Sequence, residues 1–170
     1  MKVTSLETFI VSIPYTHDEV SSVLARGGVS DVIVKLTADN GLVGWGETCG
    51  SPNPASVEEA IKYASVFVIG RDPWQIEAIA RDFFKKGLLD RRFRLGNHAL
   101  AGVDLALWDL CGKECGQPLY RLFGGAMRDE VEYFYYLAQG TPEDLVRQCK
   151  DGVMRGYSTY YLKVGIDAPA

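Results

Sequence analysis

The first third of the chain contains stretches in which apolar and polar residues alternate. Residues 2–13 alternate in this way, which is typical of a strand with one buried face. Pro14 follows, and because proline has no backbone N–H to donate to a ladder, we expect the strand to end there. Residues 15–30 show no sustained period and include the pair Gly27-Gly28, so they are predicted to form a long mobile loop of the kind that often covers a ligand.

A tight hairpin is predicted immediately afterwards. Residues 31–38 alternate, and residues 42–49 follow with a second strand-like pattern. Between them stands Asp39-Asn40-Gly41, and these residue types readily adopt the positive φ angles of a short hairpin turn. The chain is therefore expected to open as a three-stranded antiparallel meander.

Three helices are predicted in the middle of the chain. Ser56, followed by acidic residues, indicates a capped helix over residues 56–68, which Gly70 ends. An Asp-Pro pair opens a second helix over residues 72–86, which closes on basic side chains. Residues 97–114 carry apolar side chains three and four positions apart. Small residues in this third helix would let another element approach its backbone, so it is expected to be sandwiched.

The pattern changes after residue 130. Residues 131–138 form a nearly continuous apolar and aromatic run, residues 141–155 follow as a helix, and residues 157–165 form a further strand. This order predicts a strand-helix-strand unit with parallel strands. A complete (β/α)₈ barrel needs about 250 residues, so we expect either that the chain is truncated or that partner chains cover the exposed strands.

Composition excludes some classes of partner. The 22 acidic and 18 basic residues give a net charge of −4, and no Lys/Arg block is present that could follow a phosphate backbone, so nucleic acid is not expected as a partner. The start of the chain lacks the pattern of a signal peptide, and no apolar run approaches the roughly 18 residues of a membrane span. A cytoplasmic protein without a membrane partner is the simplest expectation.

The four cysteines do not indicate a metal site. Cys49, Cys111, Cys115 and Cys149 form no Cys-x-x-Cys pair, and neither His17 nor His98 lies near any of them in the sequence. A zinc site would need such ligands close together. Buried, reduced thiols are therefore predicted.

Three motifs in a fixed order resemble the mandelate racemase/muconate lactonizing enzyme family of the enolase superfamily. They are GLVGWGE at 41–47, ALAGVDLALWDLCGK at 99–113 with GQPLYRLFGG at 116–125, and YLKVG at 161–165. The resemblance covers the whole chain. It implies an α+β capping domain at 1–125, with the meander and helices, followed by the first β-α-β of a modified TIM barrel, left incomplete, at 126–170.

The resemblance also implies a chemistry. Members of this family remove the proton α to a substrate carboxylate, and Mg²⁺ stabilises the enolate that results. The family's motif is Lys-x-Lys, and Lys163 matches its second lysine, which acts as the general base. The metal ligands of the family lie on later barrel strands, so none is expected within this chain and Mg²⁺ would be held by residues beyond position 170.

Alternation along the last strand supports the position of Lys163. With a period of two, Tyr161 and Lys163 share one face of the strand, and a lysine just before a Val-Gly turn lies at the carboxyl end, where barrels build their active sites. Tyr161 departs from the family pattern, which commonly has lysine there. A neutral phenol cannot lower the pKa of the base by charge repulsion, so Tyr161 is either an auxiliary group that donates a hydrogen bond or a core side chain.

Substrate selection in the family falls to two capping-domain segments, which correspond to residues 15–30 and 49–55. The candidate substrate-binding residues are Tyr15, His17, Val23, Leu24, Arg26, Cys49 and Asn53. Arg26 could pair with a distal carboxylate or simply be solvated. Glu47 and Asp109 are expected to be structural, since Asp109 stands one helical turn before Lys113.

Two functions remain open from the sequence. The first is an enzyme, in which this chain is a fragment and acts on a small carboxylate by racemisation, epimerisation or dehydration, as a homo-oligomer and inactive without its remainder. The second is a naturally short, non-catalytic assembly or binding module with an enolase-like capping fold.

Overall fold

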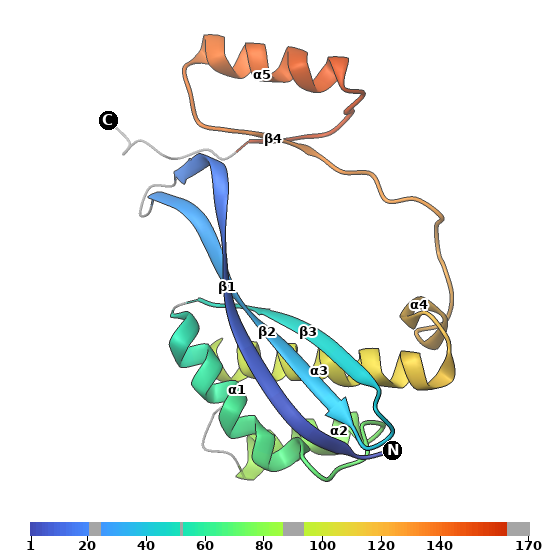
Figure 1. Cartoon of the computed structure of the whole chain (residues 1–170). Coiled ribbons are helices and arrows are strands. Elements are labelled where there is room, and N and C mark those ends of the chain that lie inside the picture. Colours follow the sequence, from blue (N-terminus) through green and yellow to red (C-terminus); the bar gives the residue numbers. More distant parts are fainter. Residues whose placement is uncertain (21–24, 52, 87–93, 163–170) are drawn as a thin grey trace. The chain divides into compact units, whose positions relative to one another are not determined.

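The computed structural model describes residues 1–20, 25–51, 53–86 and 94–162. These residues form two compact units. The first unit comprises residues 1–12 and 30–126, and the second comprises residues 13–29 and 127–170. The elements are labelled in Figure 1. The predicted division at residue 125 into a capping domain and a barrel domain stays a prediction.

A three-stranded sheet opens the chain, as predicted. Its strands are β1 (Val3–Val20), β2 (Ala25–Ala38) and β3 (Val43–Cys49), in the order β1-β2-β3. Strands β2 and β3 are antiparallel, with Thr37 opposite Val43 and Asp31 opposite Cys49. The turn between them uses Gly41 at φ +83°, a left-handed conformation that glycine adopts without steric cost. The predicted hairpin is confirmed.

The prediction of a strand end at Pro14 and a loop over residues 15–30 is wrong. Strand β1 runs through Pro14 to Val20, and β2 begins at Ala25. A proline is tolerated here because β1 is an edge strand, where a missing N–H need not break a ladder. Gly28 contributes as well, since a Cβ at this position would lie 2.7 Å from the carbonyl oxygen of Ile13. The glycine therefore permits the strands to pair where a loop was expected.

Three helices cover one face of the sheet (Figure 1). They are α1 (Pro54–Val68), α2 (Ile76–Lys86) and α3 (Arg94–Cys115). Strand β2 alternates between buried and half-buried positions over residues 31–38, so one set of its side chains enters the core. The fully buried side chains on the sheet and helices include Val32, Val34, Leu36, Val57, Ile61, Phe83, Val103, Leu107 and Leu110.

The helix starts differ from the predictions. Asn53, and not Ser56, caps α1, because its side-chain oxygen accepts hydrogen bonds from the backbone N–H groups of Ala55 and Ser56. Asp72 caps a turn instead of a helix: its carboxylate accepts from the N–H of Trp74 at 3.1 Å, and α2 begins only at Ile76. Side chains of this kind can accept hydrogen bonds either in a turn or at the start of a helix. The residue type alone therefore does not determine where each helix begins.

Strand β3 and helix α3 approach each other unusually closely. A Cβ on Gly46 would clash with the carbonyl oxygen of Gly102 and lie 2.8 Å from the backbone nitrogen of Ala106. A Cβ on Gly44 would clash with the carbonyl oxygen of Ala106. Helix α3 also contacts α1 and α2. The prediction that this helix is sandwiched is confirmed.

An ion pair on α3 completes this contact. Lys113 and Asp109 are 2.6 Å apart, one helical turn from each other, as predicted. Asp109 also accepts a hydrogen bond from the backbone N–H of Trp45 at 2.8 Å, and Lys113 donates to the carbonyl oxygen of Val43 at 2.7 Å. Since β3 is an edge strand, the pair satisfies backbone groups that would otherwise lack a partner.

The second unit contains the predicted strand-helix-strand. Strand β4 (Tyr135–Leu137) and strand β5 (Tyr160–Leu162) are parallel, and α5 (Pro142–Met154) connects them. Thr141 caps α5 in a capping box with Asp144. Strand β4 is shorter than predicted, because residues 130–134 are exposed and outside any strand. The first unit is thus an antiparallel sheet covered by helices, and the second contains a parallel strand-helix-strand.

The close approach predicts a steric requirement at Gly46. Replacing Gly46 by alanine is expected to lower the free energy of unfolding by about 3 kcal/mol, because the added methyl group meets backbone atoms that cannot rotate away. Urea unfolding followed by tryptophan fluorescence measures this, since Trp45, Trp74 and Trp108 all lie in the first unit.

Gly27→Ala is the matched control. A Cβ on Gly27 meets only the end of the Asp18 side chain, at 3.1 Å, so the change should be about 0.5 kcal/mol or less. Equal effects of the two substitutions would contradict the proposed role of the β3–α3 contact.

Candidate functional site

The parallel pair β4–β5 presents two chemically different faces. In register, Tyr135 pairs with Tyr160 and Tyr136 pairs with Tyr161. Tyr135 and Tyr160 point toward α5: the hydroxyl of Tyr135 donates to Asp151 at 2.7 Å, and that of Tyr160 bonds to the carbonyl oxygen of Cys149 at 3.2 Å. The hydrogen bond between Tyr135 and Asp151 raises the pKa of the phenol and lowers the pKa of the carboxyl. This face is structural.

The opposite face carries three aromatic rings. The ring of Tyr136 stacks on that of Tyr161, with centroids 5.6 Å apart and an interplanar angle of 21°. The ring of Phe134 lies 5.3 Å from that of Tyr161, tilted by 35°. All three side chains are exposed, Tyr161 by 43%. We call Phe134, Tyr136 and Tyr161 the aromatic face.

Tyr161 therefore lies on the face of the sheet away from α5. The candidate base Lys163 lies outside the described residues, and its role stays a prediction. Strand β5 is described to Leu162, directly before it. Sequence reasoning did not single out Phe134 or Tyr136; the alternation in the run EYFYYLA could have indicated them, because positions two apart share a face.

A hollow of about 930 Å³ lies within the second unit. Tyr15 and Asp18 line it from β1, and Tyr136 lines it from the aromatic face. Glu19 and the start of α5, including Asp144 and Arg147, complete much of the wall. The hollow thus joins a candidate substrate residue, Tyr15, to the carboxyl end of β4.

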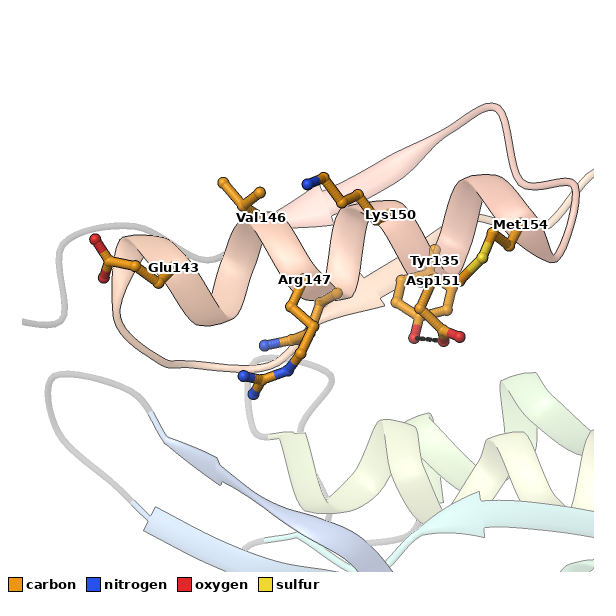
Figure 2. Close-up of a pocket in the computed structure, with 8 residues that line it drawn as sticks. Tyr135, Glu143, Val146, Arg147, Lys150, Asp151 and Met154 are labelled. Carbon is orange, nitrogen blue, oxygen red and sulfur yellow. Dashed lines mark hydrogen bonds between the residues drawn. The ribbon is translucent and has the colours of Figure 1, made fainter.

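A second hollow, of about 640 Å³, follows α5 on the side where Tyr135 contacts Asp151 (Figure 2). Arg147 pairs with Asp144 at 2.6 Å, and Asp151 pairs with Arg155 at 2.9 Å. Arg147 and Asp151, which line this hollow, are therefore both held in ion pairs within α5 or at its end. We assign no chemistry to it.

The other candidate substrate residues are placed as follows. Arg26 lies in β2 and forms an ion pair with Glu19 at 2.6 Å, so its charge is already matched. Cys49 is the exposed last residue of β3, and Asn53 caps α1. Val23 and Leu24 lie outside the described residues, as does the side chain of His17. Their part in substrate binding stays a prediction.

Two further polar residues have structural contacts. The Nδ1 atom of His98 lies 3.0 Å from the carbonyl oxygen of Cys49, which connects α3 to the end of β3. Asp109 bonds the backbone of β3, as described above. The contact of Asp109 agrees with its predicted structural role.

The described residues do not form a metal site. Across residues 1–20, 25–51, 53–86 and 94–162, no three His, Cys, Asp or Glu side chains lie together so that they could hold a metal ion. In the same ranges, no helix combines the length and the apolar character needed to cross a bilayer.

The prediction of buried thiols is correct for Cys111 and wrong for two others. All four cysteines are free, but Cys49 and Cys115 are exposed and Cys149 is half-buried. Cys115 ends the helix, beyond the apolar stretch that buries Cys111. Burial raises the pKa of the Cys111 thiol to about 12, with smaller contributions from nearby acidic groups.

Comparison with known protein families identifies the family of this chain. Residues 5–124 match the family model described as the N-terminal domain of mandelate racemase/muconate lactonizing enzyme. The fold is thus the capping domain of the enolase superfamily joined to the first strands of its barrel. The chain belongs to the mandelate racemase/muconate lactonizing enzyme family.

The relatives are enzymes. A cis-3-hydroxy-L-proline dehydratase from Roseibium aggregatum is 34% identical over 99% of this chain and 46% of its own length. A D-galactonate dehydratase from Pectobacterium atrosepticum is 33% identical over 77% of this chain and 34% of its own length. The structure of a dipeptide epimerase from Enterococcus faecalis, complexed with Mg and the dipeptide L-Leu-L-Tyr, is 25% identical with a TM-score of 0.86, over 97% of this chain and 46% of that one. The chain spans less than half the length of each.

Thiol reactivity tests the burial of Cys111. At pH 8 its raised pKa keeps the thiol protonated, so iodoacetamide should modify Cys49 and Cys115 in the folded protein and leave Cys111 unmodified. Mass spectrometry of tryptic peptides measures the extent at each position. In concentrated urea all four cysteines should react at similar rates, and native labelling of Cys111 as fast as Cys49 would contradict the packing of α3.

Proposed function

We propose that this chain is the capping domain and the first barrel strands of an enzyme that removes the α-proton of a carboxylate substrate. The support is membership of a family whose relatives include dehydratases and an epimerase. Loss of water across the α and β carbons and inversion at the α carbon share a first step, which is removal of the α-proton. The proposal therefore covers both outcomes.

Lys163 is the general base in this proposal. The observation that carries this assignment is the parallel strand β5, on which Tyr161 lies on the face away from α5. The sequence prediction, from a period of two, is that Lys163 shares the face of Tyr161. Its neutral amine would take the proton. Tyr161 is an auxiliary group that could donate a hydrogen bond to the substrate carboxylate.

Mg²⁺ is the expected cofactor, because the family resemblance implies it and an epimerase of similar fold is complexed with Mg. When bound, the metal ion stabilises negative charge on the carboxylate as the proton leaves. The family resemblance places the metal ligands on later barrel strands, so the ligands are expected beyond residue 170.

The relatives suggest two substrate classes. One acts on a hydroxyproline and others act on D-galactonate, so an amino acid and a sugar acid are both candidates. The capping-domain residues Tyr15, His17, Val23, Leu24, Arg26, Cys49 and Asn53 remain proposed substrate contacts. A homo-oligomer is also proposed, because exposed barrel strands promote association between chains.

Replacing Lys163 tests the base. In the protein that carries this segment and a complete barrel, Lys163→Ala should lower exchange of the substrate α-proton by at least about 10²-fold, the lower end for a general base. Exchange in deuterium oxide, followed by proton NMR, measures the effect, and unchanged tryptophan fluorescence shows that the fold persists.

Lys150→Ala is the matched control, because Lys150 lies on the exposed surface of α5 and removes the same charge from the same unit. It should leave exchange unchanged. Exchange retained in Lys163→Ala would exclude Lys163 as the base, and a wild-type protein without exchange on any carboxylate would favour the non-catalytic module.

A further inference from the structure

We infer that Gln139 contacts the substrate and that Gln148 holds it in position, so that the hollow beside β4 recognises hydroxyl groups of the substrate. This inference rests on the proposed function and names a residue that selects the substrate. It is carried by the hydrogen bonds that fix the segment between β4 and α5 and by the polar groups that line the hollow.

Helix α5 fixes the backbone at the carboxyl end of β4. The side chain of Gln148 accepts a hydrogen bond from the backbone N–H of Ala138 at 2.7 Å and donates one to the carbonyl oxygen of Ala138 at 3.2 Å. One side-chain amide thus satisfies both backbone groups of the residue that directly follows the strand. This pairing needs a donor and an acceptor on the same planar group, which an amide supplies.

The far end of the same segment is fixed as well. The carboxylate of Asp144 accepts hydrogen bonds from the backbone N–H and the hydroxyl of Thr141, at 3.2 and 3.0 Å. A Cβ on Gly140 would lie 2.8 Å from the Cβ of Asp144, so the backbone at Gly140 packs directly on the helix. Gln139 therefore stands between residues whose backbones are held by α5 on both sides.

Gln139 faces the hollow of about 930 Å³ described above. It is exposed and lines that hollow, as does Tyr136, whose ring stacks on that of the proposed auxiliary group Tyr161. The carboxyl ends of barrel strands are where barrels bind their substrates. Because the backbone on either side is already fixed, a contact made by Gln139 needs only its side chain to be ordered, which lowers the entropic cost of binding.

The wall around Gln139 favours a hydroxyl over a second carboxylate. The carboxylates of Glu19 and Asp144 are each paired with an arginine at 2.6 Å. Among the described residues, Asp18 is the carboxylate of this wall that has no ion pair. Substrate hydroxyls can donate to a carboxylate and can accept from an amide, whereas a second carboxylate would meet negative charge.

Paired probes test the contact. In the protein with a complete barrel, cis-3-hydroxy-L-proline is compared with L-proline, and D-galactonate with D-glycerate, which lacks the distal hydroxyls. Exchange of the α-proton in deuterium oxide gives KM for each hydroxy acid, and its inhibition gives Ki for each analogue. Gln139→Ala should raise KM for the accepted hydroxy acid about 3- to 13-fold, as expected for one neutral hydrogen bond, with kcat and the analogue's Ki unchanged.

Gln117→Ala is the matched control, because Gln117 is an exposed glutamine of the first unit. It should leave KM and Ki unchanged.

A double substitution tests the positioning role of Gln148. Gln148→Leu removes both hydrogen bonds to Ala138 and should raise the same KM. If Gln148 acts through Gln139, adding Gln148→Leu to Gln139→Ala should change KM by less than about 2-fold, whereas independent effects would multiply. Multiplying effects, or a loss of helix signal in the circular dichroism of Gln148→Leu, would overturn the positioning role.

The outcomes separate this inference from the proposed function. Unchanged KM in Gln139→Ala, or equal increases in KM and in the analogue's Ki, would overturn the inference while α-proton exchange upheld the proposed function. Exchange on a dipeptide such as L-Leu-L-Tyr and on neither hydroxy acid would do the same. Absence of exchange on all three would overturn the proposed function itself, and a loss confined to the hydroxy acid supports both.

Discussion

The first unit depends on the distance between strand β3 and helix α3. Glycines at 44 and 46 and small residues at 102 and 106 remove the side chains that would hold the two backbones apart. Asp109 and Lys113 then bond directly to the backbone of β3. Close packing, edge-strand hydrogen bonding and an ion pair thus converge on one interface, so a change to any of these residues disturbs the others.

This interface explains why the motifs at 41–47 and 99–113 occur together. The first motif supplies the glycines and an edge strand, and the second supplies the small residues, the carboxylate and the ammonium that meet that strand. Glu47 and Asp109 belong to these motifs. Asp109 contacts the backbone of β3 and the side chain of Lys113, both within the first unit. The chemical groups of the proposed reaction instead belong to the second unit.

Local patterns predicted most of the elements, and non-local contacts decided their limits. The hairpin at residue 41, helix α3 and the strand-helix-strand could be predicted because alternation, helical spacing and turn chemistry are encoded within a few residues. The extension of β1 past Pro14 could not, because it depends on β1 being an edge strand and on Gly28 lying opposite Ile13. The cap of α1 was misplaced for a related reason: Asn53 and Ser56 are both good capping residues, and the sequence does not show which one the chain uses.

The candidate site shows the same limit. The period of two placed Tyr161 on one face of its strand. Its partner rings, Phe134 and Tyr136, stand 27 and 25 residues earlier in the sequence and are brought to it by the parallel register of β4 and β5. A nearly continuous apolar run is typical of a strand buried on both faces. In the structure the tyrosines of β4 and β5 fall into two pairs. One pair contacts α5, the helix that connects the strands, and the other pair lies on the opposite face.

Helix α5 satisfies the hydroxyls of Tyr135 and Tyr160, so these tyrosines fix the strands to the helix. Tyr136 and Tyr161 point the other way, and their rings contact each other instead of the helix. In a complete barrel the chemistry lies on the inner face at the carboxyl ends of the strands, and the proposed function places Tyr161 on that face. The alternation along two short strands therefore separates the tyrosines that fix the strands to α5 from the tyrosines whose rings stack on each other.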